Sequence, residues 1–135
     1  MTRCRCPAVL SARRRGAADR GATSIEMVIL LPALFALMFL GMQAALIYQG
    51  RAVVLAAAQE GAREAASETG TAISGIRTAE SFAAASTTGL NGVTVVGRRT
   101  ATVATVTVSA TTLSVIPGWS PTITQSASMP VERVT

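Results

Sequence analysis

The hydrophobic pattern of the chain is dominated by one apolar run, residues 27–48, which contains no charged residue. As an α-helix, its 22 residues would extend about 33 Å at ~1.5 Å per residue, close to the roughly 30 Å thickness of a bilayer core. Strong helix formers continue through residues 51–69 and stop at Gly70. The pattern therefore predicts one continuous helix of about 45 residues from Ser24. The transmembrane segment is assigned to residues 22–50.

Some residues of this run have particular expected roles. Pro32 removes one backbone hydrogen bond and should kink the helix about a turn and a half from its start. Gln43 is expected to form a satisfied contact between helices, since a polar side chain in lipid needs a partner. Tyr48 suits the interface on the far side of the membrane, and Arg51 marks the exit of the helix into water.

After Asn91-Gly92 the pattern changes from helical spacing to the alternation of β-strands. The clearest case is residues 104–110, where apolar side chains share one face and hydroxyl side chains fill the other. The expected elements are a break at 71–75, a helix at 76–86, strands at 93–96 and 101–110 joined by a hairpin at 97–100, a loop at 113–121, and a strand at 122–131. The sequence thus predicts a membrane-anchored α+β protein. Its long N-terminal transmembrane helix extends into an exported domain at residues 51–135, which adds a second short helix and a small antiparallel β-sheet.

Small residues on the helix extension indicate a packing surface. One face consists of Val54, Ala58, Ala62 and Ala66, and a second small pair consists of Gly61 and Ala65. Small side chains permit close approach of another element. That element is a helix outside this chain or the chain's own sheet; both can hold on different faces, and the sequence does not apportion them.

Other side chains of the exported part have simple structural interpretations. Glu60, Glu64 and Glu68 are expected to form a solvated helix edge, with Arg63 three residues from Glu60. Trp119, in the predicted loop, is expected to pack in the core or within that loop rather than to bind a ligand. The expected inner face of the second helix consists of Ile76, Ala79, Phe82 and Ala83.

The net charge of +5 belongs to one end of the 135-residue chain. Residues 1–21 carry six arginines and one aspartate, whereas residues 22–135 carry six arginines and six glutamates. The neutral remainder argues against a nucleic-acid partner. Residues 1–21 are short, basic and rich in small residues, so we expect a disordered leader. Because arginines favour the cytoplasmic side, the N-terminus should be cytoplasmic and the C-terminal domain extracytoplasmic.

The chemistry of the exported part is sparse. Residues 51–135 contain no His, Cys, Asp or Lys, which supply most general bases, thiol nucleophiles and metal ligands. We therefore expect no enzymatic activity, no catalytic residue, no metal site and no cofactor. Cys4 and Cys6 both lie in the leader, and a Cys-x-Cys pair without a nearby His is a weak metal signal.

The junction between the leader and the apolar run contains a carboxylate in a costly place. Glu26 directly precedes the apolar run, where a simple membrane anchor has no need of a charge. Gly21 and Ala22 lie five and four positions before it. A small residue five positions before a Glu, just ahead of an apolar helix, resembles the cleavage site of type IV prepilin-like proteins.

Two further motifs follow this junction in order, Leu30-Leu31-Pro32 and the Ala-rich stretch at residues 57–66. Over residues 20–66 the chain thus resembles the TadE-like pseudopilins, minor components of tight-adherence (Flp-type) pilus machines. Met27 stands where that family commonly has an aromatic residue. The related TadF- and TadG-like proteins share parts of the same signature.

The resemblance implies a pilin-like fold and cleavage by a prepilin peptidase on the cytoplasmic side, between Gly21 and Ala22. Glu26 would serve in peptidase recognition and in assembly, paired with the new amine of Ala22 on a neighbouring subunit. The implied partners are the lipid bilayer, the prepilin peptidase, other pilin-like subunits and the pilus assembly machinery. The alternative is an uncleaved single-pass membrane protein whose exported domain binds a ligand or an envelope partner.

Overall fold

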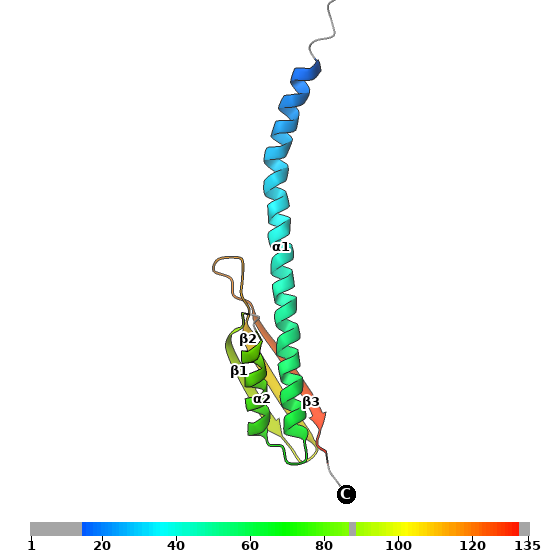
Figure 1. The fold of residues 1–135 in the computed structure, drawn as a ribbon, viewed down its shortest axis with the longest axis vertical. Helices are drawn as coiled ribbons and strands as arrows, with labels where there is room; N and C mark the ends of the chain where they lie inside the picture. Colours follow the sequence, from blue (N-terminus) through cyan, green and yellow to red (C-terminus); the bar gives the residue numbers. More distant parts are fainter. Residues whose placement is uncertain (1–14, 87–88, 133–135) are drawn as a thin grey trace, which may run out of the picture. The chain divides into compact units, whose positions relative to one another are not determined.

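The computed structural model describes residues 15–86 and 89–132. They form two helices and three strands (Figure 1): α1 (Arg15–Ala66), α2 (Ala72–Ala85), β1 (Asn91–Arg99), β2 (Val103–Thr111) and β3 (Thr122–Pro130). The long apolar helix, the second short helix and the antiparallel sheet confirm the predicted α+β class. The chain divides into two compact units, Met1–Met38 and Phe39–Thr135, so α1 contributes to both.

The helix α1 begins earlier than the sequence predicted. A helix from Ser24 was expected after a disordered leader at residues 1–21, but α1 starts at Arg15 and includes the end of that leader. This stretch contains arginines and alanines, which are strong helix formers, and no proline. Adding such residues to a helix that is already nucleated is favourable. Residues 1–14, which include both cysteines, lie outside the described residues.

A short break separates α1 from α2, and a reciprocal pair of capping hydrogen bonds marks the start of α2. The Thr71 Oγ1 accepts a hydrogen bond from the Ser74 N–H at 3.0 Å, and the Ser74 Oγ accepts one from the Thr71 N–H at 2.9 Å. This capping box fixes the start of α2 at Ala72. The predicted helix start at Ile76 was therefore too late, because Ser74 fills the cap position at which Glu or Gln is more usual.

In the sheet, β2 is the central strand and pairs antiparallel with both neighbours. Its predicted alternation is confirmed, since Ala104, Val106, Val108 and Ala110 are all buried. On the other face, hydroxyl groups of β2 and β3 pair as Thr105–Ser128 at 2.8 Å, Thr107–Ser126 at 3.0 Å and Ser109–Thr124 at 2.9 Å. Cross-strand pairs of this kind contribute roughly 0.2–1 kcal/mol each. The sheet is thus apolar on its inner face and polar on its outer face.

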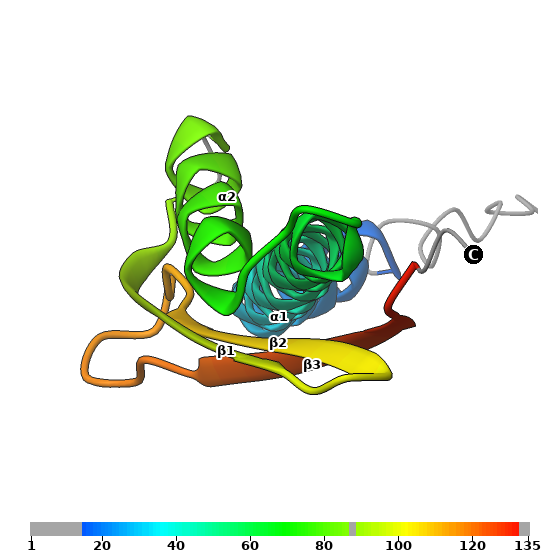
Figure 2. The ribbon, with the colours of Figure 1, turned by 90° about the horizontal axis from the view of Figure 1, so that it is seen from below.

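The helix α2 and the part of α1 from Phe39 onward cover the same, inner face of the sheet (Figure 2). Among the described residues, nine of the thirteen buried apolar side chains are alanines. Their small size allows the helices to lie close to the sheet, but each buries little apolar surface. The stability of this domain therefore depends on close backbone approach more than on bulky core side chains.

The strand β1 is longer than predicted and includes Gly97, Arg98 and Arg99, which had been assigned to the hairpin. The turn lies just beyond, where the Thr100 N–H donates to the Val103 carbonyl at 2.8 Å. A Cβ at Gly97 would lie 2.9 Å from Ile76 Cγ1. Gly97 therefore gives α2 room to pack on β1, which is a tertiary requirement rather than a turn signal.

Two aromatic side chains lie outside the core, and of these Phe82 was expected on the inner face of α2. Phe82 is 39% exposed and Trp119 is 46% exposed. On α2 the fully buried positions are Gly75, Ala79 and Ala83, all small residues, while the half-buried Ile76 packs at Gly97 of β1. The segment around Trp119 is a loop between β2 and β3, as predicted, but the side chain does not pack in the core.

Candidate processing site and membrane helix

The predicted processing site lies within α1. Gly21 and Ala22 have helical backbone, and the helix continues without a break to Glu26 and beyond. Because residues i and i+4 lie on the same face of an α-helix, Ala22 and Glu26 share a face one turn apart. A glycine inside a helix costs about 1 kcal/mol relative to alanine, so Gly21 lowers the local stability of α1 next to its bond with Ala22.

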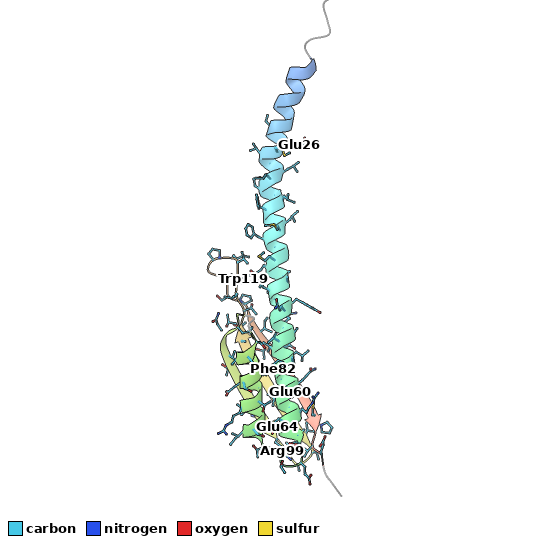
Figure 3. All side chains as sticks on the ribbon, viewed as in Figure 1. Glu26, Glu60, Glu64, Phe82, Arg99 and Trp119 are labelled. Atoms are coloured by element: carbon cyan, nitrogen blue, oxygen red, sulfur yellow. The ribbon has the colours of Figure 1, made fainter. Side chains whose placement is uncertain are left out.

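Glu26 is exposed on α1, as are its neighbours Ile25 and Met27, with 66% and 62% of their surface accessible (Figure 3). Among the described residues no ion pair involves this carboxylate. The exposed carboxylate of Glu26 is accessible to a partner outside the chain.

The apolar part of α1 is long and apolar enough to cross a membrane. The helix from Ile25 to Ala66 contains such a window, and none of that window is buried. Large apolar side chains between Ile25 and Met42 are about half or more exposed, with Leu34 at 68%. A row of this kind is costly in water and suits a lipid environment. Pro32 lies inside this stretch of α1, and the kink expected there stays a prediction.

The small residues of the predicted packing surface are occupied within the chain. All five, Ala58, Gly61, Ala62, Ala65 and Ala66, are buried. A Cβ at Gly61 would lie 2.6 Å from the Gly75 carbonyl oxygen on α2 and 3.2 Å from Val106 Cγ1 on β2. Of the two possibilities left open by the sequence, the structure shows packing against the chain's own α2 and sheet.

Gln43 has a role that the sequence did not reveal. Its side chain is only 3% exposed, and its Oε1 accepts hydrogen bonds from the Val115 N–H at 2.8 Å and the Ser114 Oγ at 3.3 Å. Its Nε2 has no hydrogen-bond partner among the described residues. The predicted helix contact is thus a contact with the loop between β2 and β3. The only signal for this contact in the sequence was a single amide side chain in an apolar run, because its hydrogen-bond partner, Val115, lies 72 residues further along the chain.

Two of the three carboxylates predicted to form a solvated helix edge lie on α1 (Figure 3): Glu64 is exposed, and Glu60 pairs with Arg63 at 3.5 Å. Glu68 is also exposed, but α1 ends at Ala66, earlier than the predicted end at residue 69, so Glu68 lies in the turn beyond the helix. An exposed pair of this kind contributes about 0–1 kcal/mol. Within residues 15–86 and 89–132 there is no group of three His, Cys, Asp or Glu side chains that could hold a metal ion.

These observations define an α+β protein with a candidate membrane span near its N-terminus. Residues 21–63 match the family model of TadE-like proteins, which confirms the predicted resemblance. The matched segment starts at Gly21, includes Glu26, and ends within α1, so it covers less than half of the chain and none of the sheet. Neither a curated protein nor a solved structure matches the chain. The TadE-like segment suggests a pilus-associated protein, and the candidate span is consistent with membrane anchoring.

Proposed function

We propose that this chain is a minor pseudopilin of a tight-adherence (Flp-type) pilus machine, with a structural and non-enzymatic role. It enters the membrane with its N-terminus in the cytoplasm, and a prepilin peptidase then removes residues 1–21. The mature subunit begins at Ala22 and is anchored by the apolar part of α1. Its α+β domain contacts other pilin-like subunits and the assembly machinery on the extracytoplasmic side.

One observation carries this proposal. The TadE-like match begins at Gly21, and from there a single helix continues through Glu26 and the apolar stretch into the folded domain. A membrane anchor alone requires neither a small residue nor a carboxylate at this point, and the carboxylate is unfavourable beside hydrocarbon. A processing and assembly signal explains both residues.

Cleavage would also change the electrostatics of the helix end. The new amine of Ala22 would lie in the first turn, where the helix dipole disfavours a positive charge. Glu26, one turn further along the same face, would offset that charge within the chain or across two neighbouring subunits. Its carboxylate thus gains a partner only after the leader is removed.

The two cysteines provide a direct test, because both lie in the segment to be removed. After solubilisation and treatment with a maleimide-linked polyethylene glycol, the precursor should shift on a gel and the mature chain should not. Co-expression with an active prepilin peptidase of a tight-adherence system should abolish the shift. Gly21→Val should restore it, since a branched side chain replaces the small residue before the scissile bond. Gly16→Val, the same change elsewhere in α1, is the matched control and should be processed normally.

Two results would contradict the proposal. A chain that keeps its shift while the same cells cleave another pilin precursor supports the uncleaved single-pass alternative. Equal loss of processing in Gly16→Val and Gly21→Val means that helix content, and not the residue before the scissile bond, controls cleavage.

A further inference from the structure

The loop between β2 and β3, residues 112–121, is held by hydrogen bonds at its base and at its tip. At its base, the Thr112 N–H donates to the Pro121 carbonyl at 3.1 Å. At its tip, the Trp119 N–H donates to the Ile116 carbonyl at 3.3 Å, and Gly118 has a φ of 80°. Proline followed by a glycine with positive φ is the arrangement of a type II turn. The loop therefore holds its side chains in defined positions.

This loop is fastened to α1 at Gln43. The two hydrogen bonds to Gln43 Oε1, from the Val115 N–H and the Ser114 Oγ, hold the loop against a helix position inside the predicted span of residues 27–48. Gln43 and the loop belong to the same compact unit. Because Gln43 lies inside the predicted span, a loop that is hydrogen-bonded to it lies close to the membrane that α1 crosses.

The surface around this contact is apolar and uncharged. In the loop, Leu113, Ile116 and Trp119 are 51%, 42% and 46% exposed, and the chain has no charged residue from Thr100 to Val131. On the neighbouring part of α1, the exposed apolar side chains are Phe39, Leu40 and Met42. In Figure 3, Trp119 and Arg99 lie at opposite ends of the sheet domain. The domain is therefore apolar at the Gln43 end and charged at the other.

The loop backbone is also suited to a poorly hydrated layer. Pro117 and Pro121 have no N–H, and the N–H groups of Val115, Ile116 and Trp119 all donate hydrogen bonds. Unpaired backbone groups normally exclude loops from the hydrocarbon core, and these bonds, with the two prolines, lower the number of free N–H groups, as suits the interfacial layer rather than the core. Trp in turn prefers the boundary between headgroups and acyl chains.

We propose that residues 113–119 form a second membrane contact, which lies in the interfacial layer of the bilayer that α1 spans. This inference rests on the proposed membrane anchoring of α1. It moves the water boundary from Tyr48 and Arg51 toward Gln43 and brings the sheet domain down onto the membrane surface. Since the loop carries no charge, its partner is the apolar boundary of a zwitterionic bilayer, and the contact is insensitive to salt and to anionic lipid.

Trp119 tests this inference without a label, because it is the only Trp of the chain. The full-length protein is placed in nanodiscs of phosphatidylcholine, with and without bromine atoms on the acyl chains near the headgroups. We expect a blue-shifted emission, protection from the aqueous quencher acrylamide, and about two-fold lower emission in the brominated discs, as for a Trp at the lipid interface. Adding salt or anionic lipid should change none of these readings.

Two variants, each made on a Trp119→Phe background, distinguish a failure of the loop contact from a failure of the membrane anchoring of α1. Val96→Trp reports on the outer face of the sheet, where Val96 is 56% exposed, and should be quenched by acrylamide but not by bromine. Leu34→Trp reports on the apolar part of α1 and should be quenched by bromolipid whether or not the loop touches the membrane. The loop contact is overturned if Trp119 is quenched by acrylamide and not by bromine, as expected for Val96→Trp, while Leu34→Trp is quenched by bromolipid. That result leaves the membrane anchoring of α1 intact. Protection of Trp119 from both quenchers indicates that another protein surface covers it, which also overturns the inference.

Discussion

Glu26 and Gln43 are polar side chains in an otherwise apolar stretch of α1, and their situations differ. Gln43 is buried, and its oxygen accepts two hydrogen bonds from the loop between β2 and β3. Glu26 is exposed and has no ion-pair partner among the described residues. The buried oxygen of Gln43 has its partners within the fold, whereas an exposed carboxylate beside an apolar helix needs an explanation outside the folded chain. The proposed explanation is recognition and assembly.

Replacing Glu26 by Gln removes the charge and keeps the shape of the side chain. We expect Glu26→Gln to be inserted in the membrane at least as well as the wild type, because a neutral amide costs less beside hydrocarbon. We expect it to lose copurification with the other pilin-like subunits, because no carboxylate remains to pair with the Ala22 amine. Cross-linking and pull-down from cells that express the whole system measure both effects. Glu64→Gln, an exposed carboxylate elsewhere on α1, is the control and should copurify normally; equal recovery of both variants would remove Glu26 from assembly.

Local patterns predicted the buried residues well and the long-range contacts poorly. The helical spacing of Val54, Ala58 and Ala62 predicted their burial, because helix geometry puts such residues on one face. Nothing near Gln43 in the sequence identifies Val115 as its partner. Trp119 was expected to pack in the core or within its loop; it is 46% exposed and lies outside the core, and packing within the loop stays a prediction.

The contact between α1 and α2 depends on two glycines that face each other. A Cβ at Gly75 would lie 2.5 Å from the Gly61 carbonyl oxygen and 2.7 Å from Ala65 Cβ. The Gly61 backbone is thus in direct contact with α2, and the same helix pair covers the sheet. This requirement for backbone approach explains why these helix interiors contain glycine despite its low helix propensity.

Gly75→Ala should therefore weaken the domain. Overpacking costs about 1–3 kcal/mol, and the gain in helix propensity returns up to about 1 kcal/mol, so we expect a net loss of about 1–2 kcal/mol in the free energy of unfolding. Thermal unfolding of the full chain in detergent, followed by circular dichroism, measures it. Gly41→Ala is the matched control, since no atom lies within 4 Å of a Cβ placed there. Unfolding of Gly75→Ala at the wild-type temperature would show that α1 and α2 are not closely packed.

The sequence predicted every helix and strand but misplaced several of their ends. The alternation in β2 and the long helical pattern of α1 are strong local signals, and both elements were found. The start of α2 and the end of β1 depend on tertiary or capping contacts, namely the Thr71–Ser74 cap and the fit of Gly97 beneath Ile76. The fit of Gly97 beneath Ile76 involves another element, so local composition does not reveal it, and the local cap was missed because Ser74 stands where Glu or Gln is more usual.

At the scale of the whole molecule, the chain combines a candidate membrane helix, a TadE-like junction and a small helix-covered sheet. If the loop at residues 113–119 rests on the bilayer, the unit Phe39–Thr135 is attached to the membrane at two places and cannot rotate freely about α1. Its polar outer sheet face and its charged end then remain exposed to partners. This restriction suits a subunit that assembles laterally with its neighbours in the membrane.

The most direct test of the central claim is the N-terminal residue of the chain recovered from membranes. The chain is produced together with an active prepilin peptidase of a tight-adherence system, and its N-terminus is determined by sequencing and intact mass. We expect Ala22 as the first residue, and Met1 when the peptidase is inactive. A chain that still begins at Met1 beside an active peptidase, or that begins at any residue other than Ala22, would contradict processing at Gly21.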